Sequence, residues 1–111
     1  MKIKMFIFLD DERTPPDGWI LVRWPEEVIS LLKKGPVEKI SLDHDLGDDD
    51  HGTGYDVIKW IEEAVVVDKF VPPEIYVHSA NPAAKTRMLN GIDAINRHHE
   101  NNLKRRLSPS L

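Results

Sequence analysis

Three short motifs contain most of the residues that could do chemistry in this chain: FLDDER at residues 8–13, SLDHDLG at 41–47 and VHSANP at 77–82. Each motif begins where an apolar, strand-like run ends. In an open parallel sheet the ends of neighbouring strands lie side by side, and ligands bind beyond their carboxyl ends. We therefore expect the polar side chains of the three motifs to meet in one pocket. These side chains are Asp10, Asp11, Asp43, His44, Asp45, His78 and Ser79.

The acidic pair Asp10 and Asp11 indicates a divalent cation, because a pocket that gathers several carboxylates needs a counter-charge. Two adjacent acids at a strand end allow one to bind Mg²⁺ directly and the other through water, and Mg²⁺ favours carboxylates, retained waters and phosphate oxygens. Aspartates also suit turns and helix caps, so the pair alone does not decide. Arg13, just beyond, is either a phosphate ligand or a partner of these acids.

The central motif places Asp43 and Asp45 on one side of a strand and His44 on the other, if the alternation of the strand persists to its end. Asp43 is a candidate metal ligand, or a nucleophile that forms an acyl-phosphate. The neighbours Leu42 and Leu46 are apolar, so these polar groups are not simply solvated surface. The alternative is a buried histidine paired with an aspartate for structural reasons.

The third motif supplies a proton-transfer group and phosphate ligands. His78 has the right intrinsic pKa to act as a general acid or base near neutrality. Ser79, between a strand end and a helix start, can offer its hydroxyl and nearby backbone N–H groups to a phosphate. In the structural alternative Ser79 and Asn81 only cap the helix, and Asn81 can do both. We interpret His51, in the acidic loop, as a surface residue.

The donor types favour Mg²⁺ or Mn²⁺, with Zn²⁺ as a weaker candidate. Carboxylates and phosphates suit Mg²⁺ and Mn²⁺, whereas imidazole suits transition metals better. The histidine motifs HExxH and HxxxH are absent from the sequence.

Composition predicts one ordinary globular domain. The chain has 111 residues, 41% of them hydrophobic and 31% charged, and no cysteine, which excludes disulfides and thiolate metal sites. The apolar stretch at the start is too short for a signal peptide and runs directly into acids. No segment approaches the roughly 18 apolar residues needed to cross a membrane, so we expect a cytoplasmic protein.

The net charge of −4 is unevenly distributed, because residues 83–111 carry six basic and only two acidic side chains. A basic last helix beside an acidic pocket could steer a phosphate-bearing ligand. We favour the simpler interpretation, a solvated helix whose last-turn cations complement its dipole. The overall acidity argues against binding to duplex DNA.

Strands and helices alternate along the chain, which predicts an α/β sheet. Strands are expected at residues 3–9, 19–24, 39–42 and 74–78. Helices are expected from Pro25 to a stop at Gly35, over 55–68, and from Pro82 with Asn81 as its cap. Met88, Leu89, Ile92 and Ile95 mark the buried face of the last helix.

The connection between the first two strands is too short for a normal crossover. About nine residues separate Leu9 from Trp19, whereas a parallel crossover usually needs a dozen or more. Either the first helix is reduced to a turn or loop, or the second strand does not pair in the usual way.

At these residues the sequence resembles response-regulator receiver domains. Those domains carry an acidic pair after the first strand, a phosphoacceptor aspartate ending the third and a Ser or Thr ending the fourth. The matching positions here are Asp10 with Asp11, Asp43 and Ser79. The sequence resembles more closely the cyclic-phosphate-processing receiver domains, through LDDERTP, SLDHDLG, TGYD and HSANP, which follow one another over most of the chain. His44 and His78 belong to this closer pattern and not to the general one.

The resemblance implies a small receiver-like (flavodoxin-like) three-layer sandwich with a mostly parallel four-stranded sheet, a reduced first helix and no fifth strand. We expect one domain over residues 1–106 and a flexible tail over 107–111. With no fifth strand, the lysine that bonds a phosphoryl group in ordinary receivers is missing, which argues against a phosphorylation switch.

The resemblance further implies a metal-dependent phosphoester hydrolase acting on cyclic phosphates of nucleotides or RNA ends. Asp10, Asp11 and Asp43 would hold the metal, and His78 or His44 would protonate the leaving oxygen. Arg13, Ser79 and Asn81 would bind phosphate, and Asp45 and Thr53 are additional candidates. The main alternative is a receiver-derived phosphate-binding or signalling module without turnover. A weaker alternative, a host-interaction protein of a mobile element, has no residue in its favour.

Overall fold

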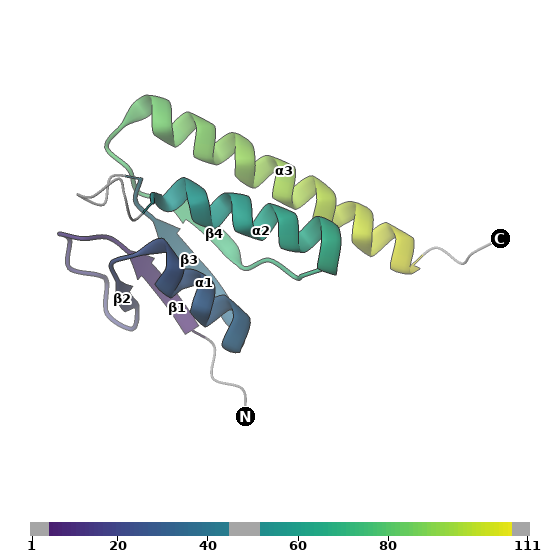
Figure 1. The fold of residues 1–111 in the computed structure, drawn as a ribbon, viewed down its shortest axis with the longest axis horizontal. Coiled ribbons are helices and arrows are strands. Elements are labelled where there is room, and N and C mark those ends of the chain that lie inside the picture. Colours follow the sequence, from purple (N-terminus) through teal and green to yellow (C-terminus); the bar gives the residue numbers. More distant parts are fainter. Residues whose placement is uncertain (1–4, 45–51, 108–111) are drawn as a thin grey trace.

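The computed structural model describes residues 5–44 and 52–107. Strands and helices alternate in it from the first strand to the last helix (Figure 1). The elements are β1 (Met5–Leu9), β2 (Ile20–Val22), α1 (Pro25–Lys34), β3 (Val37–Leu42), α2 (Gly54–Asp68), β4 (Glu74–Val77) and α3 (Pro82–Leu107).

The four strands form one parallel sheet in the order β2-β1-β3-β4, which confirms the receiver-like α/β fold. Their last residues lie in one row, because Leu9 is opposite both Val22 and Leu42, and Leu42 is opposite Val77. Any polar residue that follows a strand therefore emerges at the same edge of the sheet.

A loop takes the place of a helix between β1 and β2. Residues 10–19 contain no helix, and Gly18 adopts a φ of 88°, a conformation that glycine tolerates better than other residues. β2 still pairs in parallel with β1, so the reduced first helix is the correct alternative. Trp19, at the end of the loop, packs its ring against Phe6 and Phe8, with centroids 5.3 and 6.3 Å apart.

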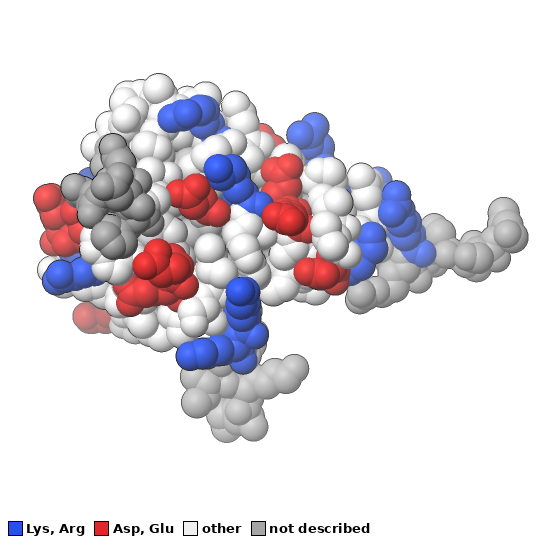
Figure 2. Space-filling model, in the orientation of Figure 1, with Lys and Arg blue, Asp and Glu red and all other residues white. Residues whose placement is uncertain are grey.

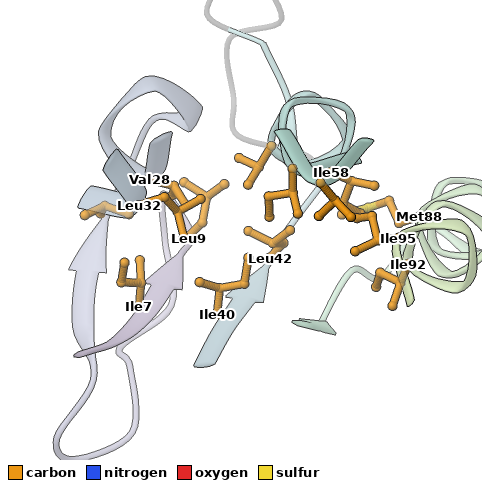
Figure 3. Packing of buried hydrophobic residues seen from close by; sticks show 14 residues of the cluster. Ile7, Leu9, Val28, Leu32, Ile40, Leu42, Ile58, Met88, Ile92 and Ile95 are labelled. Carbon is orange, nitrogen blue, oxygen red and sulfur yellow. The ribbon is translucent and has the colours of Figure 1, made fainter. Parts of the chain in front are cut away.

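The hydrophobic core lies on one face of the sheet (Figure 3). Every second residue of the central strands points into the core, and all three helices contribute to the same cluster. The labelled members are Ile7, Leu9, Val28, Leu32, Ile40, Leu42, Ile58, Met88, Ile92 and Ile95. Alternation sends Phe6, Phe8, Ser41 and Tyr76 to the opposite face.

The three-layer sandwich that the resemblance implies has helices on both faces of the sheet, whereas the three helices in the described residues all pack on one face. Two features explain the open second face. The loop between β1 and β2 replaces a helix there, and no strand follows β4 in the part of the chain that the structure describes. Trp19 covers Phe6 and Phe8 in place of a helix.

The helix ends follow the local sequence. Pro25 occupies the first turn of α1, and the helix ends before Gly35, as expected. Thr53 and Asp56 form a capping box at the start of α2: the Asp56 carboxylate accepts a 2.7 Å hydrogen bond from the Thr53 backbone N–H. Asn81 caps α3 by accepting a 3.2 Å hydrogen bond from the backbone N–H of Ala84.

One expected core residue of α3 is exposed. Leu89 has 44% of its surface accessible, while Met88, Ile92 and Ile95 are buried. α3 packs mainly on α2 and, beyond it, on the edge strand β4, so only a narrow stripe of the helix faces the core. Leu107, expected in the tail, is the last residue of α3, and the rest of that tail lies outside the described residues. Among the described helices, none is both long enough and apolar enough to span a membrane.

Candidate functional site

The row of strand ends brings together one residue from each of three motifs. The backbone N–H groups of Asp10, Asp43 and His78 each donate to the last carbonyl of a neighbouring strand. The bonds run from Asp10 to Val22, from Asp43 to Leu9 and from His78 to Leu42, at 3.1, 3.0 and 3.0 Å. Ligand atoms of Asp10, Asp43 and His78 all lie within 4.8 Å of one another, a spacing suited to a shared metal ion.

Asp10 is a buried carboxylate that several donors surround. Only 1% of its surface is exposed. Its Oδ1 accepts hydrogen bonds from the backbone N–H groups of Glu12 at 2.8 Å and Arg13 at 3.1 Å. Burial by itself would raise the pKa of Asp10, but these two backbone donors and His78 together bring the pKa below its usual value. Asp10 is therefore ionised at neutral pH.

His78 is held on both ring nitrogens and on one ring face. Nε2 lies 3.0 Å from Asp10 Oδ2, and Nδ1 lies 2.7 Å from the hydroxyl oxygen of Ser41. The ring stacks on Phe8 at a centroid distance of 4.3 Å and an interplanar angle of 5°. Burial lowers the pKa of His78 and outweighs the opposing effects of Asp10 and Asp43. The imidazole is therefore neutral at neutral pH.

Asp43 is half-buried, and the start of α2 packs against its backbone. A Cβ atom on Gly54 would overlap the carbonyl oxygen of Asp43, so only glycine permits this approach. The capping box of Thr53 and Asp56 fixes the same turn of α2. The TGYD motif therefore sets the position of the strand end that carries Asp43.

Arg13 reaches Asp10 and His78 from the loop that replaces the first helix. Its Nη1 donates a 3.2 Å hydrogen bond to the backbone carbonyl of His78, and its Nε lies 3.8 Å from Asp10 Oδ2. The side chain is still 56% exposed, so it remains available to a ligand. The sequence left two roles open for Arg13, phosphate ligand or partner of the acidic pair. The structure shows Arg13 next to the Asp10 carboxylate, in agreement with the second role.

Other predicted site residues do not belong to the cluster of Asp10, Asp43 and His78. Asp11 is half-exposed and does not belong to the group of three possible ligands, and His44 is half-buried next to Asp43. The Ser79 hydroxyl accepts a 3.1 Å hydrogen bond from the backbone N–H of Asn81, which is the capping geometry. Thr53 caps α2. Asp45 and His51 lie outside the described residues.

Two residues that contact the His78 ring, Ser41 and Phe8, were assigned no role from the sequence. Ser41 is buried, with 8% of its surface exposed, and it is the one polar residue among the three buried positions of β3. A serine at a buried strand position next to a polar motif is a signal that could have been used, because buried hydroxyls need a partner. Phe8 gave no signal, since an aromatic residue in a strand is ordinary.

A family model described as cyclic-phosphate processing receiver domain matches residues 5–94. The match includes all three strand-end motifs and most of the chain. The chain belongs to this family. No curated protein and no solved structure gives a significant match.

The donor set of this cyclic-phosphate processing receiver domain fits a divalent cation. Two carboxylates that follow different strands lie close together, and the Arg13 Nε lies 3.8 Å from Asp10 Oδ2. Asp10 remains ionised despite its burial, so a bound cation would interact favourably with its carboxylate. The geometry does not select one ion.

The basic residues of α3 are spread along a long helix, and lysine and arginine side chains are scattered over the face drawn in Figure 2. α3 has 26 residues, which corresponds to about 39 Å of helix. Lys85 and Arg87 lie near its start, close in sequence to the pocket, whereas Lys104 and Arg105 lie near its other end. The second pair is placed to complement the helix dipole, in agreement with the simpler interpretation.

Proposed function

We propose that this chain is a metal-dependent phosphoester hydrolase that opens cyclic phosphates of nucleotides or RNA ends. The observation that carries the proposal is the meeting of Asp10, Asp43 and His78 at three adjacent strand ends in a member of a cyclic-phosphate processing family. The cluster combines carboxylates for a cation with an imidazole for proton transfer, and ring opening of a cyclic phosphate needs both.

The carboxylates of Asp10, Asp11 and Asp43 would hold Mg²⁺ or Mn²⁺, with Zn²⁺ less suited to them. When bound, the cation would supply charge neutralisation at the phosphate oxygens. Asp10 is well prepared for this role, because its backbone hydrogen bonds keep it ionised and fixed. Asp43 could alternatively act as a nucleophile, because it directly follows β3 at the position of the phosphoacceptor aspartate in receivers.

Arg13, Ser79 and Asn81 would bind the phosphate oxygens, and each retains a donor for this purpose. The exposed Arg13 guanidinium uses Nη1 for the His78 carbonyl and has further N–H groups. The Ser79 hydroxyl accepts its capping bond and keeps its hydrogen. Asn81 caps α3 through Oδ1, which leaves the two hydrogens of its Nδ2.

His78 or His44 would protonate the leaving oxygen. His78 is the better supported of the two, because its ring is oriented by three contacts in the same pocket as Asp10 and Asp43. To protonate the leaving oxygen, His78 would take up a proton from solvent and then transfer one to that oxygen, which returns the ring to its neutral form.

The proposal predicts that the protein opens a 2′,3′-cyclic nucleotide in the presence of Mg²⁺. Asp43→Asn and His78→Ala should each lower kcat/KM on the order of a hundredfold or more, because each removes a charge or proton-transfer group from the pocket. Phosphorus NMR of the product measures the rate and shows which phosphoester bond was broken.

Asp93→Asn and His99→Ala on α3 are matched controls, because they change the same residue types outside the pocket. Activity equal to wild type in Asp43→Asn and His78→Ala would contradict the proposal. Stable labelling of Asp43 by a small phosphodonor, with no cyclic nucleotide consumed, would favour the non-catalytic receiver-like module.

A further inference from the structure

We propose that Ser41 is a positioning residue which, together with Asp10, holds the His78 ring with a hydrogen on Nε2. In this state His78 acts in the pocket as a hydrogen-bond donor and not as a metal ligand. The inference deepens the proposed function, because it assigns cation binding to the carboxylates and hydrogen-bond donation to His78. Only the predicted change in kcat rests on that function.

The contacts of His78 leave its ring almost no freedom. Its backbone N–H donates to Leu42 and its backbone carbonyl accepts from Arg13. Phe8 lies parallel to the ring, which sets the plane of the imidazole. Ser41 and Asp10 then contact the two ring nitrogens at 2.7 and 3.0 Å. The side chain of His78 is 15% exposed, so little room remains for another orientation.

Asp10 decides which nitrogen carries the hydrogen. An ionised carboxylate only accepts hydrogen bonds, so the hydrogen in the 3.0 Å contact between Nε2 and Oδ2 belongs to Nε2. This holds for the neutral ring and for the protonated ring. A nitrogen that carries a hydrogen has no lone pair for a metal ion.

Ser41 completes the arrangement at Nδ1. In the neutral ring Nδ1 is an acceptor, and the Ser41 hydroxyl donates to it. A side chain without a hydroxyl at position 41 would leave Nδ1 without a hydrogen-bond partner in a buried site. Asp10, at Nε2, would then be the remaining hydrogen-bond partner of the ring. Ser41 has 8% of its surface exposed, so it is poorly placed to attack a substrate itself.

The consequence is a cation site made of carboxylates beside a separate imidazole donor. Asp10 and Asp43 provide hard oxygen ligands, which Mg²⁺ and Mn²⁺ prefer, and the imidazole does not add a nitrogen that would favour Zn²⁺. The spacing within 4.8 Å is compatible with a three-ligand site as well, so the hydrogen on Nε2 distinguishes the two arrangements.

The direct test is nitrogen NMR of the histidine rings at pH 8, first without metal and then with saturating Mg²⁺. We expect Nε2 of His78 to carry the hydrogen in the metal-free protein and to keep it when Mg²⁺ is added. A ring protonated on Nδ1 alone, or loss of the Nε2 hydrogen on addition of Mg²⁺, would overturn the proposal.

Ser41→Thr and Ser41→Val form a matched pair, because the two side chains share a shape that suits a strand and differ by a hydroxyl. Ser41→Thr should keep a single His78 ring state. Ser41→Val should give mixed or exchange-broadened ring signals and lower kcat on the order of tenfold, with Mg²⁺ affinity and KM changed less than twofold. Ser30→Ala, an exposed serine on α1, is the control.

Identical ring spectra and kcat in Ser41→Thr and Ser41→Val would refute the positioning role. If Ser41→Val does not fold, Ser41→Ala replaces it in the same comparison. If wild type itself hydrolyses no cyclic nucleotide, the proposed function fails, while the ring spectra of the variants still decide the role of Ser41.

Discussion

Asp10 and His78 show how the surroundings of a single side chain change its pKa. Both have a pKa below the ordinary value, but for different reasons. Burial lowers the pKa of His78 directly, whereas for Asp10 the backbone donors overcome the effect of burial. In the metal-free protein the pair consists of a neutral imidazole and an ionised carboxylate, which is the state that a cation and a phosphate would meet.

These shifts predict that the metal-free protein loses stability on acidification. The folded state binds a proton on His78 less readily than the unfolded state does. The stability linked to His78 is therefore fully present above its ordinary pKa of 6.5. It is lost as the pH falls through the lower pKa that His78 has in the folded protein. Asp10 behaves in the same way below its ordinary pKa of 3.8. One such group changes the free energy of unfolding by at most about 1.4 kcal/mol per pH unit.

Urea unfolding between pH 8 and pH 5 measures this dependence. His78→Gln should flatten the fall in the free energy of unfolding below pH 6.5. His99→Gln, on α3, should leave the slope as in wild type. An unfolding free energy that rises on acidification, or an unchanged slope in His78→Gln, would contradict the assigned cause.

At the scale of elements, the start of α2 fixes the strand end that carries Asp43. Gly54 lies against the Asp43 carbonyl, and the capping box begins the helix there. A backbone atom cannot move aside as a flexible side chain can, so this contact links the TGYD motif mechanically to the pocket.

Gly54→Ala should therefore reduce the free energy of unfolding by about 1–3 kcal/mol or more, as overpacking does. Gly35→Ala is the matched control, because a Cβ there would be 3.8 Å from the nearest atom, an ordinary contact with Met5. The urea midpoints of the two variants give the comparison. An equal, small effect in both would show that α2 does not press on Asp43.

At the scale of the whole molecule, the hydrophobic core lies on one face of the sheet and the candidate site lies at the ends of the strands. The three helices in the described residues pack on one sheet face, so the hydrophobic core lies on one side of the strand ends. The other side consists of the loop after β1 and the aromatic contacts of Trp19 with Phe6 and Phe8. Binding of a cation to ligands from β1 and β3 would connect the central strands of the sheet.

Mg²⁺ should consequently raise the unfolding temperature of the entire domain. A ligand present at 100 times its Kd adds about 2.7 kcal/mol to the free energy of unfolding, which corresponds to a shift on the order of 10 °C for a domain of this size. Asp43→Asn should lose most of the shift, and Asp93→Asn should retain it. A thermal scan with and without Mg²⁺ makes the measurement. A full shift in Asp43→Asn would exclude that residue as a ligand.

The sequence determined the parallel sheet and the meeting of the three motifs, because alternation and strand ends are local properties of the chain. It left two alternatives for the connection between β1 and β2, and the structure selected the reduced first helix. Tertiary structure decided what each residue contacts. It excluded Leu89 from the core, and it gave Ser41 and Phe8 their place around His78. Such contacts join residues far apart in sequence, as Ser41 and His78 are. These contacts depend on the order and register of the strands in the sheet. The spacing of residues along one strand does not predict either.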